Sequence, residues 1–226
     1  MKIKTKSVLL AALLTVLANT QVYAAQDEYL THMLAGQEAS KTGNYAEAAK
    51  LYQAAVDDRA SQPKSYEMMV AKECLGRQFK RLRKFKEAEE MFVQATDGYA
   101  ACKGPKSLDV ALSAGFLGSI YMLDGKAADA IVASDRAIAA GQDKQEAQTE
   151  LAHWYCFRGT CLGALKRSGA EESFKRSMEL VEKLPPDELL AADISDYAAY
   201  LERNGDKAAA EKMNAKAKAI LAKIKK

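Results

Sequence analysis

Four residues in one short stretch have side chains that could bind a metal ion or take part in catalysis: Glu150, His153, Cys156 and Cys161. In a helix His153 and Cys156, three residues apart, share a face and could hold a soft metal ion. Cys161 lies five residues after Cys156, about 140° around a helix, so the two thiols can neither bridge each other nor easily share one ion. Because a histidine beside a buried cysteine is more often ordinary packing, we predict no metal and no cofactor.

Motifs of known enzyme classes are missing from the sequence. It contains no G-x-S-x-G, no HExxH and no C-x-x-C. Residues 98–107 (GYAACKGPKS) resemble a phosphate-binding loop only faintly, because the spacing is one residue too long and a proline precedes Lys106. We interpret this stretch as a junction between structural units, and we predict that the protein is not an enzyme.

The first 24 residues have the features of a secretory signal peptide. Lysines at positions 2, 4 and 6 precede an apolar run at 7–18, and Ala24 stands where a signal peptidase would cleave. We therefore predict cleavage near Ala24 and export, with the mature protein periplasmic or secreted. The apolar run is about half of the ~20 residues that span a bilayer, and no later run approaches that length, so we predict no transmembrane segment.

The predicted mature chain is close to neutral. The whole sequence has 33 Lys and Arg against 30 Asp and Glu, and the excess of three equals the three lysines of the predicted signal peptide. A nucleic-acid-binding surface needs a real basic excess, so we predict no nucleic-acid partner.

The four cysteines raise the question of disulfides, because an oxidising compartment retains them. Three pairings are formally available. The helix geometry excludes Cys156 with Cys161, and with it the complementary pair Cys74 and Cys102, while the other two pairings stay open. We favour buried free thiols, which pack as small hydrophobic groups.

An alanine recurs about every 40 residues from Ala48 onward. Its counterparts, at steps of 40, 42, 40 and 40 residues, are Ala88, Ala130, Ala170 and Ala210. Four residues later stand Tyr52, Phe92, Ser134, Phe174 and Asn214, and seven residues later stand Ala55, Ala95, Ala137, Ser177 and Ala217. Positions i, i+4 and i+7 share a helix face, so each copy predicts a helix that packs closely on its neighbours. A fixed period of this length predicts a repeat architecture.

A companion helix precedes each copy, with its own signature of Ala35-Gly36, Leu75-Gly76, Leu117-Gly118, Arg158-Gly159 and Tyr197-Ala198. A further position three residues on holds Ala39, Phe79, Tyr121, Leu162 and Leu201. These residues, and the turns between the two helices, resemble the tetratricopeptide repeat (TPR). The TPR pattern W-x2-L-G-x2-Y…A-x3-F is nearly met by Leu75-Gly76, Phe79, Ala88 and Phe92.

The resemblance implies an all-α fold, a right-handed superhelical solenoid of about five helix-turn-helix repeats with about ten helices. The 40–42-residue period resembles the long repeats of kinesin light chains. The solenoid would span 25–226, with repeats at about 29–68, 69–110, 111–150, 151–188 and 189–226, and we expect the turn of the fourth repeat to be one residue short. Ser65, Ser107 and Asp187 are predicted to cap first helices. The packing positions implied are Gly36, Ala48, Tyr52, Gly76, Ala88, Phe92, Gly118, Tyr121, Ala130, Ala170, Phe174 and Ala210.

In the TPR family five positions of each first helix face a concave groove, and the resemblance implies that these positions contact a partner. The residues so predicted are Met33, Gln37, Glu73, Arg77, Lys80, Arg81, Ser119, Met122 and Thr160, and the same positions include Gly115, Gly163, Ala164 and Arg203. Arg77, Lys80 and Arg81 form a cationic stretch that would suit acidic groups of a peptide. The same cations would also suit a solvated helix C-terminus.

The function that we expect is a non-enzymatic protein–protein interaction scaffold of the bacterial envelope or exterior, which binds a peptide or protein segment in its groove. Two alternatives stay open. One is a regulatory or sensing module that binds a small ligand or peptide. The other is a metalloprotein centred on His153 and Cys156.

Overall fold

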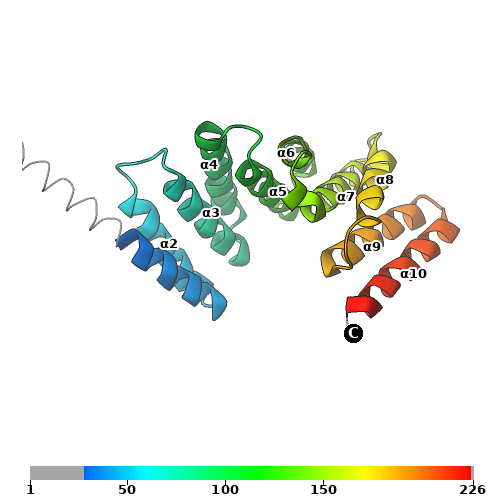
Figure 1. Cartoon of the computed structure of the whole chain (residues 1–226), viewed down its shortest axis with the longest axis horizontal. Coiled ribbons are helices and arrows are strands. Elements are labelled where there is room, and N and C mark those ends of the chain that lie inside the picture. The colour runs from blue at the N-terminus through cyan, green and yellow to red at the C-terminus, as the bar shows by residue number, and fades with distance from the viewer. Residues whose placement is uncertain (1–27, 225–226) are drawn as a thin grey trace, which may run out of the picture. The chain divides into compact units, whose positions relative to one another are not determined.

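The computed structural model describes residues 28–224, and within this range the chain forms α-helices and no strand. Residues 28–41 are helical. They are followed by α2 (Tyr45–Asp58), α3 (Tyr66–Arg81), α4 (Phe85–Lys103), α5 (Leu108–Leu123), α6 (Ala127–Gly141), the 3-10 helix η1 (Gln145–Ala147), α7 (Gln148–Ala164), α8 (Ala170–Val181), α9 (Glu188–Arg203) and α10 (Lys207–Ile224) (Figure 1). The predicted fold class, an all-α helical repeat solenoid, is confirmed. The predicted signal peptide lies outside the described residues, and the handedness of the superhelix stays a prediction.

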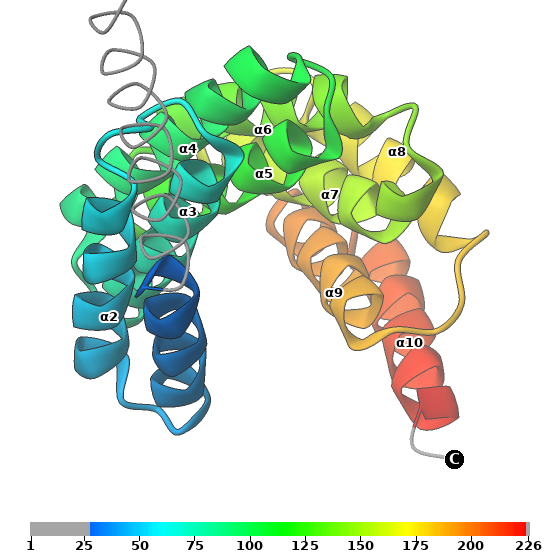
Figure 2. The ribbon, with the colours of Figure 1, turned by 60° about the vertical axis from the view of Figure 1, so that its left-hand side comes forward.

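The chain divides into two compact units at the turn between α3 and α4. The described part of unit 1 is residues 28–84, which hold the first helix, α2 and α3, and that of unit 2 is residues 85–224, which hold α4 to α10. Within unit 2 the most extensive contacts join α5 to α6, α7 to α8, and α9 to α10. Figures 1 and 2 both show α9 and α10 lying side by side. The helix pairs expected from the repeat are therefore the packing units of the fold.

The recurring small residues lie in the core of each helix pair. Ala48, Ala88 and Ala130 are fully buried, and Ala170 and Ala210 are nearly so. The rings four residues later are also buried, at Tyr52, Phe92 and Phe174. A small residue lets two helix backbones approach closely, and a ring fills the gap beside that contact. Gly36 shows the fit, because a Cβ placed there would come within 2.9 Å of the Tyr52 ring.

Three first helices begin at the caps that the sequence predicted. The side-chain oxygens of Ser65, Ser107 and Asp187 accept hydrogen bonds from the backbone N–H groups of Met68, Val110 and Leu189, over 3.2, 3.3 and 2.7 Å. Each bond satisfies one of the amides left without a partner at a helix start.

The only tryptophan of the chain locks the third helix pair to the fourth. Trp154, in α7, is 5% exposed. Its indole lies against Gly115 of α5 and Gly141 of α6: a Cβ at Gly115 would overlap the indole Nε1, and a Cβ at Gly141 would overlap Cζ3. Only glycine leaves room for the ring at these two positions. Gly115, which stands at a predicted groove position, is half-buried, with the Trp154 indole beside its Cα.

The turn of the fourth helix pair is longer than expected. Five residues, 165–169, separate α7 from α8, whereas three separate α5 from α6. The other second helices start three residues before their recurring alanine, but α8 starts at that alanine, Ala170. Gly169 has φ = 89°, which a right-handed helix cannot contain, so α8 loses its first turn. We expected the turn of the fourth repeat to be one residue short. The structure instead has a longer turn, and the element that is shortened is α8.

Candidate functional site

Unit 1 carries the predicted cationic surface on the C-terminal half of α3. Burial, followed by the charges of Arg81 and Arg77, lowers the pKa of the Lys80 ammonium, which places the three cations in one electrostatic cluster. Glu73 forms an ion pair with Arg77 one helical turn away, and the Arg81 guanidinium lies 5.4 Å from the centre of the Tyr45 ring. The cationic stretch therefore contacts both an acidic side chain and an aromatic ring of unit 1.

The first helix of unit 1 contributes the other predicted contact residues. Gln37 is exposed and Met33 is half-buried beside the small core that Tyr29 forms with Ala55 and Ala71. The Tyr29 hydroxyl donates a hydrogen bond to the Glu67 carbonyl over 3.1 Å, which ties the first helix to α3. The two helices that carry the predicted contact residues of unit 1 are therefore joined directly.

In unit 2 the predicted contact residues lie on α5 and α7, and all three are half-buried. The hydroxyls of Ser119 and Thr160 donate to carbonyls of their own helices, at Phe116 (2.7 Å) and Cys156 (3.1 Å). Met122 packs partly against the core of Ala130, Ile131 and Leu162. At the predicted contact positions, α5 and α7 therefore offer two hydroxyl groups and one methionine side chain.

The histidine singled out by the sequence is paired with a residue that the sequence analysis missed. His153 Nδ1 lies 2.7 Å from Asp193 Oδ1, a carboxylate of α9 that is 1% exposed. The Cys156 thiol donates to the backbone carbonyl of Asp193 over 3.3 Å. The repeat period was the signal that could have found this pair, because residues 40 apart occupy neighbouring first helices.

The pairing of His153 changes its proton affinity. Burial favours the neutral ring, but the hydrogen bond and charge of Asp193, with the charges of Asp196 and Glu150, outweigh it and raise the pKa of His153 above its ordinary value of 6.5. A folded-state pKa above the unfolded one means that the fold binds the proton more tightly. The stabilisation is fully present below the unfolded-state pKa and is lost as the pH rises through the folded-state pKa.

The two thiols of α7, Cys156 and Cys161, are not activated for nucleophilic or metal chemistry. Burial raises the pKa of the Cys161 thiol to about 11 and raises that of Cys156 further, so both stay protonated at neutral pH. Within residues 28–224 no three histidine, cysteine, aspartate or glutamate side chains converge on a point where they could hold a metal ion. His153 and Asp193 therefore act as a polar tie between α7 and α9.

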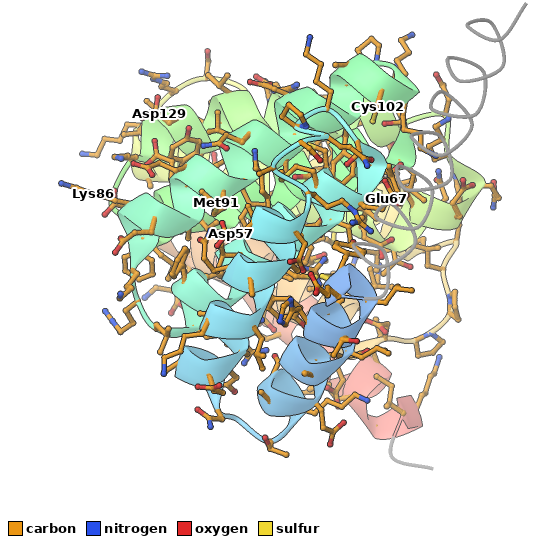
Figure 3. The ribbon with its side chains drawn as sticks, turned by 90° about the vertical axis from the view of Figure 1, so that its left-hand side faces the viewer. Asp57, Glu67, Lys86, Met91, Cys102 and Asp129 are labelled. Carbon is orange, nitrogen blue, oxygen red and sulfur yellow. The ribbon has the colours of Figure 1, made fainter. Side chains whose placement is uncertain are left out.

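All four cysteines are free thiols in the structure. Cys156 and Cys161 are buried, as expected, and Cys74 is half-buried. Cys102 is exposed at the C-terminal end of α4, with Lys86 at the other end of that helix (Figure 3), so the expectation of a buried thiol is wrong for this residue.

Two hollows lie on unit 2. The larger, about 600 Å³, is formed where α7, the turn after it and α9 meet, and it is lined by Gly163, Ala164, Lys166, Arg167, Ala170, Tyr200, Arg203 and Asn204. The smaller, about 260 Å³, lies among α8, α9 and α10 and is lined by Lys175, Met178, Glu179, Glu182, Tyr197, Met213 and Lys216. The larger hollow holds three basic side chains and no acidic one.

The sequence matches no family model and no curated protein. Solved structures do match the fold. BtubC (BKLC) from P. vanneervenii has a TM-score of 0.64 and 25% identity over 67% of this chain and 62% of that one. A Podosopora anserina protein with nearly identical kinesin light chain TPR-like repeats has a TM-score of 0.62 and 17% identity over 86% and 95% of the two chains. The chain has the tetratricopeptide repeat fold.

A third TPR structure is similar over most of both chains. YrrB, described as a TPR protein with an unusual peptide-binding site, has a TM-score of 0.58 and 17% identity, with 89% of this chain and 91% of that one covered. This chain spans less than two thirds of BtubC.

None of the helices within residues 28–224 is both long and apolar enough to cross a bilayer.

Proposed function

We propose that this TPR protein is a non-enzymatic scaffold of the bacterial envelope or exterior, which binds a protein or peptide segment on the exposed face of its first helices. The TPR-like neighbours support a role in protein–protein interaction. Export rests on the signal-peptide features of residues 1–24. The absence of enzymatic activity rests on the lack of catalytic motifs and on the protonated, buried state of Cys156 and Cys161.

The observation that carries this proposal is the cationic cluster of α3. Lys80 and Arg81 stand in the last turn of α3 and Arg77 stands one turn earlier, and burial together with the charges of Arg81 and Arg77 lowers the pKa of Lys80. A partner that brings carboxylates to this surface would be attracted by the positive charge at the end of α3. A peptide with acidic side chains is the segment that fits this face.

The test is capture of partners from envelope extract by the mature protein fixed on beads. The Lys80→Glu/Arg81→Glu variant is compared with Lys50→Glu/Lys64→Glu, which makes the same change in net charge at two exposed lysines elsewhere in unit 1. We expect the first variant to lose partners that the wild type and the second variant retain. Identical partners for both variants would show that the α3 cluster is not the binding surface.

A sensing module that binds a small ligand is a second candidate, and the hollow of about 600 Å³ on unit 2 favours it, because its volume lies in the range of ligand pockets. The metalloprotein alternative has no such support. Asp193 engages one nitrogen of His153, and the neighbouring Cys156 thiol stays protonated.

A further inference from the structure

The larger hollow of unit 2 combines a positive rim with a partly apolar floor. Lys166 and Arg167 lie in the long turn after α7, and Arg203 ends α9. We call these three basic residues the rim, and four of the other lining residues, Gly163, Ala164, Ala170 and Tyr200, the floor; Asn204 completes the lining. A Cβ at Gly163 would lie 2.9 Å from the Tyr200 ring, so glycine lets that ring approach α7.

The Tyr200 ring packs against two other aromatic rings of unit 2. Its centre lies 4.9 Å from that of Phe174 and 6.4 Å from that of Tyr197. Phe174 is fully buried and Tyr197 is 9% exposed, so the floor of the hollow rests on the core of unit 2. A side chain that packs on the core in this way is a feature of preformed binding sites.

The positive charges of the rim lack counter-charges within the described residues. Unit 2 has five arginines, and three of them form ion pairs: Arg136 with Asp97, Arg158 with Asp135, and Arg176 with Glu172 and Glu179. The two that form no ion pair, Arg167 and Arg203, both line the hollow. Burial raises the pKa of Asp196 and the charge of Arg203 lowers it, but the two side chains form no ion pair in the described part of the chain.

In the preceding helix pair, the basic residue of the corresponding turn does have acidic partners. Lys126, between α5 and α6, contacts Glu89 over 2.6 Å and Asp124 over 3.0 Å. Its charge is therefore compensated inside the protein. Lys166 has no such partner within residues 28–224, although it also lies between the two helices of a pair.

A purely structural role as helix caps does not account for Lys166 and Arg167. Cations favour helix C-termini because they satisfy the last carbonyls. At the end of α7 backbone amides already do so, since Leu165, Lys166 and Arg167 N–H groups donate to the carbonyls of Cys161, Gly163 and Leu162, over 3.2, 3.1 and 2.9 Å. The carbonyls at the end of α7 therefore do not need the Lys166 and Arg167 side chains as hydrogen-bond donors.

The start of α8 adds to the positive field. Its N-cap is Gly169, which has no side chain to accept a hydrogen bond from the first amides. Ala170, the first residue of that helix, lines the hollow. The positive end of the helix dipole therefore lies beside the three basic side chains.

We propose that this hollow, the rim-and-floor pocket of Lys166, Arg167, Arg203 and Tyr200, binds a carboxylate-bearing side chain of an acidic peptide segment. An inorganic anion would use the rim alone, whereas a glutamate also places its aliphatic stem on the tyrosine and the small residues of the floor. Guanidinium groups bind carboxylates through paired hydrogen bonds. This pocket would be a second contact surface, on unit 2, for the acidic partner of the proposed scaffold function, on which the inference rests.

The probe is a fluorescein-labelled peptide of glutamate and leucine, titrated with the mature protein and followed by fluorescence anisotropy, beside a control peptide in which glutamine replaces glutamate. We expect binding of the glutamate peptide only, weakened by salt. The Arg167→Glu/Arg203→Glu variant should bind at least about tenfold more weakly, the factor that one charge-assisted hydrogen bond represents. Arg167→Gln/Arg203→Gln should fall between this variant and the wild type.

The matched control is Lys183→Glu/Lys218→Glu, which changes the net charge equally at two exposed lysines outside the hollow. It should bind the peptide as the wild type does. Equal loss in both variants, equal binding of the glutamine peptide, or binding of inorganic phosphate in place of the peptide would overturn the proposal. Partner capture on the α3 cluster uses a different surface, so the scaffold function can stand when this pocket fails.

Discussion

Substitution of Gly115 by alanine should destabilise the protein through a single contact. A methyl group there would overlap the indole Nε1 of Trp154 and lie 2.9 Å from its Cε2. Trp154 is 5% exposed and is also confined by Gly141, so the ring cannot move aside. Overpacking of a core costs about 1–3 kcal/mol, against which alanine gains about 0.5–1 kcal/mol over glycine inside a helix. We expect a net loss of about 1–2 kcal/mol.

Gly118 is the matched control, three residues further along α5. A Cβ there would meet Phe157 Cε1 at 3.2 Å and nothing else closer than 3.5 Å. The gain in helix propensity should then offset most of the crowding, so Gly118→Ala should be within about 1 kcal/mol of wild type. The pair of variants separates crowding by the indole from a general effect of alanine in α5.

Urea unfolding is the assay, followed by circular dichroism and by tryptophan fluorescence. Trp154 is the only tryptophan, so its emission reports this site alone. If the indole is the obstacle, Trp154→Phe should recover much of the cost of Gly115→Ala, with a coupling of about 1 kcal/mol in the double-mutant cycle. Wild-type stability and unchanged emission in Gly115→Ala would refute the reasoning.

Three further outcomes follow from the structure. The stability difference between wild type and His153→Gln should be larger at about pH 5.5 than at about pH 8, because the pKa of His153 is raised in the folded state. Thermal melts at both pH values measure this difference. A larger difference at about pH 8 would contradict the pairing of His153 with Asp193. Gly118→Leu should cost several kcal/mol by overpacking against Phe157, seen as a lower urea midpoint, and an unchanged midpoint would contradict the packing of α5 on its neighbours. Ser107→Ala should cost about 1 kcal/mol through loss of the α5 cap, and Ser107→Asp should retain wild-type stability.

Much of the fold could be predicted from the sequence, because its determinants are local and recur. The recurring alanines lie at the buried contacts of the helix pairs, and Ser65 and Ser107 cap the helices that follow them. Each of these positions depends on residues within one repeat. A period of 40 residues therefore sufficed to place them.

The contacts between repeats were harder to predict. Trp154 fills space beside two glycines of the preceding helix pair, and Asp193 pairs with a histidine one repeat earlier. Such contacts depend on how neighbouring pairs are rotated against each other, which no local pattern encodes. Arg203, Gly163 and Ala164 of the unit 2 hollow stand at predicted groove positions, but Lys166 and Arg167 were missed because, in a turn, they have the composition of any solvated loop.

Photo-crosslinking tests most directly the central claim that partners contact the first helices. A benzoylphenylalanine is placed at Thr160 of α7 or, as the control, at Val132 of α6, a second-helix residue that is 69% exposed. Irradiation in envelope extract should link a partner to the Thr160 position and leave the Val132 position unlinked. A partner linked at Val132 and not at Thr160 would contradict the account.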